Sequence, residues 1–186
     1  MADPITHFTA GADGRWQITQ IAPFIGESLA PADRLAIGAA ARGAWSLAGV
    51  ASNLRYTTAE ERDALTPVSA PLDRGDALHA VLIPITKSAG WWALAQDERR
   101  AIYARSGHFS IGRDYLPEVA RKLYHCRDLG GEFDFLTWFE FAPQHEGAFD
   151  KLLKRLRETE EWRHVAREVE VRLVRLADAE APKPGE

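Results

Sequence analysis

The segment "FDFLTWFEFA" at residues 133–142 places the tightest limit on the fold, because it alternates and yet is apolar on both sides. In a strand, successive side chains point to opposite faces of the sheet. One face then carries Leu136 and Trp138, and the other carries Phe133, Phe135, Thr137, Phe139 and Phe141. We therefore expect a layer against each face, which is either a second sheet or a large apolar ligand held between layers.

The segments around this strand predict an α+β arrangement. Helices are expected at 95–108 and 145–162, and strands at 79–86, 119–126, 133–142 and 167–176. The last strand alternates cleanly, with Val169, Val171 and Leu173 on one face. The order β-α-β-β-α-β is that of a ferredoxin-like unit, an antiparallel sheet with helices on one face. Pro84 favours an edge position or a bulge for the strand 79–86.

The first third of the chain is more weakly patterned. Residues 13–26 and 42–57 read as strands, with an alanine-rich stretch between them. Residues 58–65 predict a helix, in which Thr58 caps the first turn and Glu61 takes the reciprocal position of a capping box. These strands are enough to form the second sheet.

Charge and composition exclude several classes of protein. The net charge of −4 gives no basic footprint for nucleic acid. A single cysteine, Cys126, rules out an internal disulfide framework and a cysteine-based metal cage. No apolar run approaches the roughly 20 residues of a membrane span, and the first residues show no secretory signal. We expect a soluble, cytoplasmic protein without a membrane or nucleic-acid partner.

Two residues in the segment 105–126 are candidates for chemistry. His108 is expected at the C-terminal end of the helix 96–108, where it either favours the helix dipole or binds a metal or a haem. One axial histidine is sufficient for haem. Arg121 shares a strand face with Val119, Leu123 and His125, so its guanidinium either reaches the rim or is held inside by an anion.

Three further residues allow two interpretations each. Glu161 is expected at the end of a helix, either as an exposed residue or as the acceptor of a histidine N–H. Trp91 and Trp92 are either core residues or the wall of a site for a planar cofactor.

Five motifs, in this order along the chain, resemble the chlorite dismutases, and in particular their short-chain lineage. They are "IPITKSAGWW", "DERR" followed by His108, "ARKLYHCRD", "FDFLTWFEFAP" and "TEEW". The resemblance implies a haem b protein of the dimeric α+β barrel group, which assembles as a homodimer. It implies two ferredoxin-like halves forming an antiparallel barrel: a truncated one at 1–75 and a haem-binding one at 76–178, before a frayed tail at 179–186.

The resemblance also assigns roles to individual residues. His108 matches the proximal haem ligand, Glu161 the acceptor of that histidine's other N–H, and Arg121 the catalytic arginine on the distal side. Lys87 and Trp91 match the rest of the proximal hydrogen-bonded set, beside Trp92. Leu123, Thr137 and Phe139 match positions that line the distal pocket. Asn53 and Tyr56 match positions that would hold the haem propionates. Ser69 departs from the pattern, because short relatives commonly carry a glutamine there that holds the arginine.

The activity that the resemblance implies is the conversion of chlorite to chloride and dioxygen. An arginine suits this reaction, because it stays charged and can retain an anionic hypochlorite-level fragment until the O–O bond forms. The alternatives are a coprohaem decarboxylase, whose distal site lacks this arginine, and a non-catalytic haem-binding stress or sensor protein. A peroxidase is a third, although no distal acid–base pair is apparent.

Overall fold

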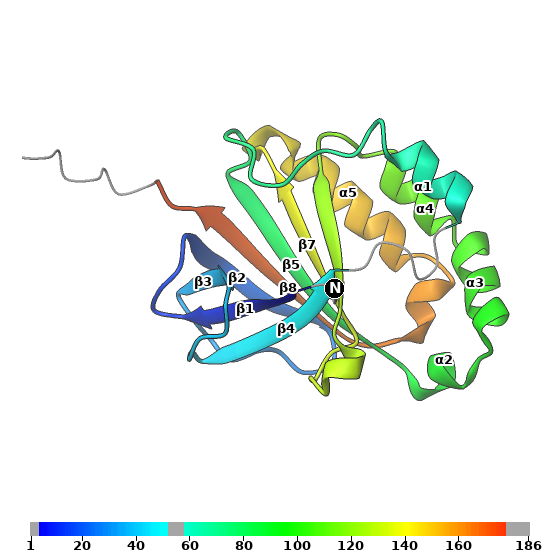
Figure 1. The fold of residues 1–186 in the computed structure, drawn as a ribbon, viewed down its shortest axis with the longest axis horizontal. Coiled ribbons are helices and arrows are strands. Elements are labelled where there is room, and N and C mark those ends of the chain that lie inside the picture. Colours follow the sequence, from blue (N-terminus) through cyan, green and yellow to red (C-terminus); the bar gives the residue numbers. More distant parts are fainter. Residues whose placement is uncertain (1–3, 52–57, 178–186) are drawn as a thin grey trace, which may run out of the picture.

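The structure is a computed structural model that describes residues 4–51 and 58–177. In these ranges eight antiparallel strands close into a barrel in the order β1-β3-β2-β8-β5-β7-β6-β4 (Figure 1). The strands are β1 (Ile5–Gly11), β2 (Trp16–Ile25), β3 (Arg34–Gly38), β4 (Trp45–Ala51), β5 (His79–Lys87), β6 (Ala120–His125), β7 (Phe135–Phe141) and β8 (Val165–Arg175).

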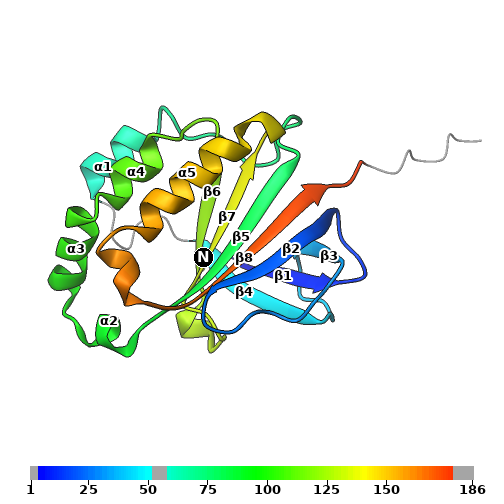
Figure 2. The same ribbon diagram turned by 180° about the vertical axis from the view of Figure 1, so that it is seen from behind.

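The helices all lie against one side of the barrel, over the outer face of the C-terminal strands (Figures 1 and 2). They are α1 (Ala59–Leu65), α2 (Ala89–Ala93), α3 (Gln96–Arg105), α4 (His108–Arg113) and α5 (Glu146–Arg157). Three short 3₁₀ turns accompany them, η1 (Arg127–Leu129), η2 (Pro143–His145) and η3 (Glu161–His164). In the described residues no helix is both long enough and apolar enough to cross a membrane.

Strand β7 is covered on both faces, as its sequence predicts. Leu136 and Trp138 point into the barrel, where Trp138 packs on Trp16 of β2 with ring centroids 5.3 Å apart. Phe139 and Phe141 face the other way, against Phe149 of α5. Phe133 is an exception: it precedes the strand and lies in the barrel core, so the alternation does not extend to it. The layer inside the barrel is the second sheet, supplied by the N-terminal strands.

The C-terminal strands pair in the order β8-β5-β7-β6, which is the order expected of a ferredoxin-like unit. The N-terminal strands repeat the same order, β4-β1-β3-β2, but short connections replace the helices. Strands β2 and β4 correspond to predicted strands, although residues 52–57 lie outside the described residues. Strands β1 and β3 are not apparent in the sequence, because each carries only two large apolar residues among small and polar ones.

Pro84 lies on a central strand, so the expectation of an edge strand is wrong. Strand β5 pairs with β7 on one side and with β8 on the other. The ladder to β8 is interrupted at Ile83 and Pro84, which accommodates the missing N–H of proline. A register irregularity does occur, but three residues later, between Thr86 and Lys87.

Two helix ends differ from the prediction, and both carry candidate residues. The expected helix 95–108 stops at Arg105, because Gly107 adopts the left-handed conformation (φ 65°), and α4 begins at His108. His108 thus lies at a helix N-terminus, where the proposed dipole interaction would be unfavourable. The second helix ends at Arg157, and Glu161 begins the turn η3 instead of closing α5.

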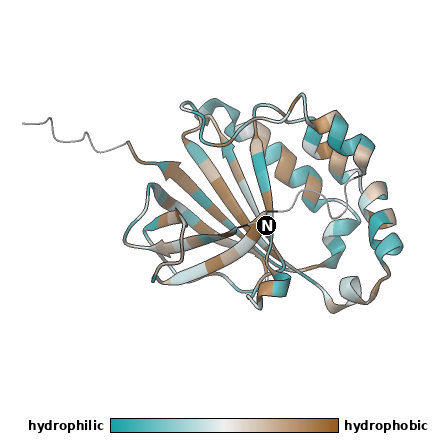
Figure 3. Cartoon of the chain, in the orientation of Figure 1, coloured by the Kyte–Doolittle hydropathy of each residue, from teal (hydrophilic) through white to brown (hydrophobic). Residues whose placement is uncertain are grey.

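The remaining local features follow the sequence closely. The capping box of α1 is present, with Thr58 N donating to Glu61 over 2.8 Å and Glu61 N donating to the Thr58 hydroxyl over 3.2 Å. Val169, Val171 and Leu173 of β8 are buried in the barrel. Hydropathy follows this layering, because apolar colour concentrates along the strands while the helices alternate between apolar and polar residues (Figure 3).

Candidate functional site

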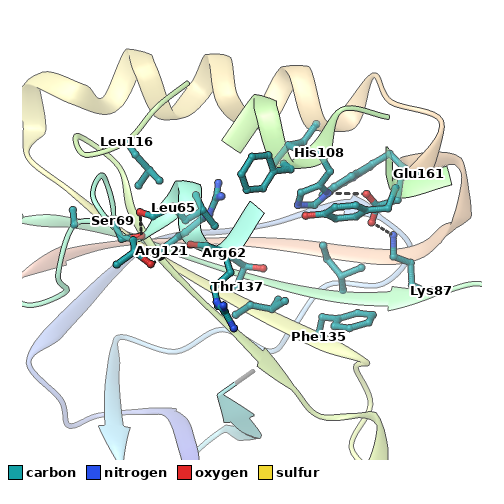
Figure 4. Close-up of a pocket in the computed structure, with 18 residues that line it drawn as sticks. Arg62, Leu65, Ser69, Lys87, His108, Leu116, Arg121, Phe135, Thr137 and Glu161 are labelled. Carbon is teal, nitrogen blue, oxygen red and sulfur yellow. Dashed lines mark hydrogen bonds and ion pairs between the residues drawn. The ribbon is translucent and has the colours of Figure 1, made fainter. Parts of the chain in front are cut away.

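A cavity of ≈ 340 Å³ lies between the helices and the outer face of β5, β6 and β7 (Figure 4). Its lining comes from segments far apart in the sequence: Arg62, Leu65, Thr66, Ser69, Ala70, Ile85, Lys87, Tyr103, His108, Phe109, Leu116, Arg121, Leu123, Phe135, Thr137, Leu156, Glu161 and Trp162. The exposed area of the wall is largely apolar. Its charged side chains and His108 lie at two places, with Lys87, His108 and Glu161 at one end and Arg62 and Arg121 at the other (Figure 4).

His108, Glu161 and Lys87 form one hydrogen-bonded chain on the helix side of the cavity. Nδ1 of His108 lies 2.7 Å from Oε2 of Glu161, and Lys87 Nζ donates to Oε1 of the same carboxylate over 2.9 Å. Burial alone would raise the pKa of Glu161, but His108 and Lys87 outweigh it and hold that pKa well below its usual range. An ionised carboxylate only accepts, so Nδ1 carries a proton, and in the neutral imidazole Nε2 then has the lone pair that a metal requires.

Trp91 packs against Lys87 of this hydrogen-bonded chain and does not itself line the cavity. The Lys87 ammonium lies 4.6 Å from the centroid of the Trp91 ring and 5.6 Å from that of Trp162. A buried ammonium between two aromatic faces gains a cation–π contribution beyond its ion pair. Trp91 therefore belongs to the surroundings of Lys87, as one of the fully buried side chains of the protein.

Trp92 does not line the cavity, so the structure does not support its role as a wall for a planar cofactor. Its indole N–H donates to Oδ2 of Asp134 over 3.0 Å, and the Arg127 guanidinium lies 3.9 Å from its ring centroid. Its neighbour Trp91 turns inward, because successive residues of the short helix α2 face different directions.

Arg121 reaches the cavity from β6 and meets the end opposite the His108 chain (Figure 4). Its side chain is enclosed by protein but keeps part of its surface open to the cavity, and burial lowers the pKa of the guanidinium, against an opposing effect of Tyr103. No carboxylate in the described part of the chain forms an ion pair with it. Ser69 lines the same region, but its hydroxyl donates to the Leu65 carbonyl over 2.9 Å and not to the arginine.

The other predicted pocket residues divide into three groups. Leu123 and Thr137 line the cavity. Phe139 does not, because it packs against Phe149 of α5 with ring centroids 5.2 Å apart, which places it in the helix-side core. Asn53 and Tyr56 lie outside the described residues.

Tyr103 lines the cavity without having been predicted. Its ring stacks on the His108 imidazole, with centroids 4.8 Å apart and an interplanar angle of 22°. Burial raises its pKa to about 12, aided by the charge of Glu161, so the phenol stays protonated at neutral pH. The break at Gly107, which folds α4 back against α3, brings the two rings together. A continuous helix would have separated the two rings. Gly107 is the only signal in the sequence for their contact, because a helix that ends there lets the chain turn back.

Comparison with known proteins identifies the family. The family model for chlorite dismutase matches residues 25–176, which is most of the chain. This chain belongs to the chlorite dismutase family. It is 32% identical over 124 residues to the chlorite dismutase of Ideonella dechloratans, a match that covers 66% of this chain and 42% of that protein, so the chain spans under half the length of that relative.

Solved chlorite dismutase structures share the fold. The dimeric enzyme from Nitrobacter winogradskyi superimposes with a TM-score of 0.87 at 54% identity, covering 91% of this chain and 99% of that one. The enzyme from Candidatus Nitrospira defluvii in complex with imidazole gives a TM-score of 0.57 at 30% identity, covering 75% of this chain and 56% of the other. The chain thus matches a short chlorite dismutase along almost its whole length, and part of a longer one.

Proposed function

We propose that this chain is a haem b enzyme that converts chlorite to chloride and dioxygen. The observation that carries the proposal is the placement of two groups at opposite ends of one largely apolar cavity. One is an imidazole whose Nδ1 is bonded to Glu161, and the other is an arginine that forms no ion pair with a carboxylate of the described residues. Membership of the chlorite dismutase family, and similarity over 91% of the chain to the Nitrobacter winogradskyi enzyme, support the same assignment.

The residues of the cavity fit a haem. A porphyrin needs apolar walls, which Leu65, Leu123 and Phe135 supply among others, and one axial donor. His108 is such a donor, since Glu161 occupies its Nδ1. Haem iron, when bound, supplies the redox chemistry that breaks Cl–O bonds and allows an O–O bond to form.

Glu161 and Lys87 set the properties of the imidazole. The carboxylate fixes the proton on Nδ1 and raises the electron density on Nε2, which strengthens histidine as a ligand. Lys87 balances the buried negative charge, so the carboxylate stays ionised in a setting where burial alone would favour protonation. The chain thereby holds His108 in one tautomer and one orientation.

Arg121 would retain the anions of the reaction. Chlorite, ClO₂⁻, gives Cl⁻ and O₂ with no other reactant, so both oxygen atoms of the product come from chlorite. The hypochlorite-level fragment that is left when a Cl–O bond breaks must therefore remain in the cavity until the O–O bond forms. A guanidinium binds such an anion by charge-assisted hydrogen bonds and does not supply a stray proton. The apolar walls at Leu116 and Leu123 exclude competing water and strengthen that attraction.

We also infer the finer organisation from the pairing pattern. The identical strand order in the two groups of four strands supports two ferredoxin-like halves. In the N-terminal one, at 1–75, short connections stand in place of the helices after β1 and after β3. The haem would be held by the C-terminal half, at 76–178. The dimeric Nitrobacter winogradskyi relative supports a homodimer.

Oxygen evolution tests the function directly. Protein loaded with haem should show the absorption spectrum of histidine-ligated ferric haem and release one dioxygen per chlorite consumed, measured with an oxygen electrode. The variant H108A should lose haem more readily. Normal haem loading without oxygen release would refute the proposed activity and favour a non-catalytic haem-binding protein. Conversion of coprohaem to haem by the same preparation would instead support the decarboxylase alternative.

A further inference from the structure

Helix α4 approaches Arg121 at a single glycine. A Cβ built on Gly112 would lie 1.8 Å from Nη1, 2.5 Å from Cζ and 2.6 Å from Nη2 of Arg121, and these are the three nearest atoms. Carbon and nitrogen atoms that are not bonded do not approach so closely, so the guanidinium occupies the space that any other residue at 112 would fill with its side chain. Gly112 is itself buried in the structure.

The glycine has no backbone reason to be there. Gly112 lies within α4 and has no positive φ, unlike Gly107 at the start of the same helix. A glycine inside a helix is less favourable than an alanine, because the flexible backbone loses more entropy on folding. The close approach of Arg121 is therefore what the missing side chain serves.

The position of this glycine also relates the two ends of the cavity. Gly112 is four residues after His108 in α4, so the two residues lie on the same face of the helix. One short helix thus carries the candidate iron ligand at its first residue and the surface that receives Arg121 one turn later. The hydroxyl of Ser69, the other candidate to hold the arginine, donates to the Leu65 carbonyl instead.

We infer that Gly112 is a positioning residue, which sets the place of the Arg121 guanidinium relative to the cavity and so the efficiency with which Arg121 retains substrate anions. The first part concerns the protein alone, and the second rests on the proposed function. Alanine at position 112 would push the guanidinium off α4, since the end of a flexible side chain moves more readily than a helix. The activity of such a variant should then lie between the activity of wild type and that of an Arg121→Ala variant.

The test compares G112A, R121A and the double variant G112A/R121A, with G147A as the control. Gly147 lies in α5, and a Cβ there would have no atom within 4 Å, so G147A makes the same helical change in open space. Oxygen release per haem before bleaching should be lower in G112A than in wild type and unchanged in G147A. It should be equal within twofold in R121A and G112A/R121A. The double variant should also melt roughly 2–4 °C above R121A, because alanine then only improves the helix.

A readout without haem or chlorite separates the inference from the proposed function. A crystal structure of haem-free G112A should show the Arg121 guanidinium displaced from α4 while His108 keeps its bond to Glu161. An unmoved guanidinium would overturn the inference, as would a further loss of oxygen release in the double variant relative to R121A. Should wild-type protein release no oxygen while the guanidinium moves in G112A, the proposed activity fails and the positioning of Arg121 stands.

Discussion

Nδ1 of His108 lies 2.7 Å from Oε2 of Glu161, and this contact makes the tautomer of the imidazole a property of the fold. Lys87 closes the chain from the other side, with its Nζ 2.9 Å from Oε1. Lys87 and Glu161 are only 7% and 6% exposed, so water solvates neither charge well if the partner of that charge is removed. The chain therefore responds to single substitutions in a way that surface ion pairs do not.

Glu161→Gln is expected to weaken haem retention by roughly 10–100-fold. The glutamine amide can donate to Nδ1, which moves the imidazole proton to Nε2, the nitrogen that would bind iron. The rate of haem transfer to an excess of a haem-free acceptor protein measures this. Glu160→Gln is the matched control, because Glu160 pairs with Arg105 at the surface. Equal transfer rates for the two variants would contradict the role of Glu161.

Arg121→Ala is expected to keep haem bound but to lower turnover and hasten bleaching of the haem. Without the guanidinium, the cavity loses the group that would hold an anionic fragment until dioxygen forms. Total oxygen released per haem and the decay of the haem absorption band measure both effects. Arg113→Ala serves as the control, since Arg113 is exposed on the same helix that approaches Arg121. A variant that bleaches no faster than wild type would argue against retention.

Glu168→Ala is expected to destabilise the protein by about 3–5 kcal/mol. The carboxylate is fully buried and accepts from Nε and Nη2 of Arg157, over 2.9 and 2.6 Å, and from the Trp162 indole over 2.6 Å. Its removal leaves the indole N–H of Trp162 without this acceptor and leaves the largely buried Arg157 guanidinium with Glu170 as its remaining carboxylate partner. Chemical denaturation measures the free energy of unfolding.

The control for this substitution is Glu158→Ala, whose carboxylate is 65% exposed and lies 4.0 Å from Lys154. That change should cost at most about 1 kcal/mol. Comparable losses in the two variants would show that burial of Glu168 is not what matters.

Cys126 is expected to resist thiol reagents in the folded protein. Burial raises the pKa of its thiol to about 12, aided by the negative charge of Asp134. At pH 8.5 a thiol with that pKa is ionised on the order of once in a few thousand molecules, whereas an unfolded thiol is about half ionised. Because the chain has one cysteine, the absorbance of a disulfide reagent reports it alone. Rapid labelling at pH 8.5 without denaturant would contradict the burial.

The C-terminal half could be predicted well because its patterns are strong. Strand β7 has apolar residues on both faces, Leu136 and Trp138 on one and Phe139 and Phe141 on the other. This pattern predicts a covering layer on each face, and both layers are found. In β8, Val169 and Val171 are equally clear. Strands β1 and β3 escaped prediction because pairing with neighbours, and not their own composition, makes them strands.

The site was harder to predict than the fold because it depends on chain breaks and on depth. A helix drawn to residue 108 hides the stacking of Tyr103 on His108, which exists only because Gly107 ends α3. Phe139 and Thr137 share a strand face, yet only Thr137 lines the cavity, since α5 covers the other position. Periodicity gives the direction of a side chain but not the helix that will lie above it.

Strand β8 joins the two groups of strands, since it pairs with β2 on one edge and β5 on the other. The Thr19 hydroxyl, for example, donates to the carbonyl of Arg172, 153 residues later. A ribosome delivers β2 early and β8 after all the other strands, so the open edge of β2 must wait for most of the chain to be synthesised. Barrel closure is therefore a late event in biogenesis, and a nascent chain carries an unpaired edge until then.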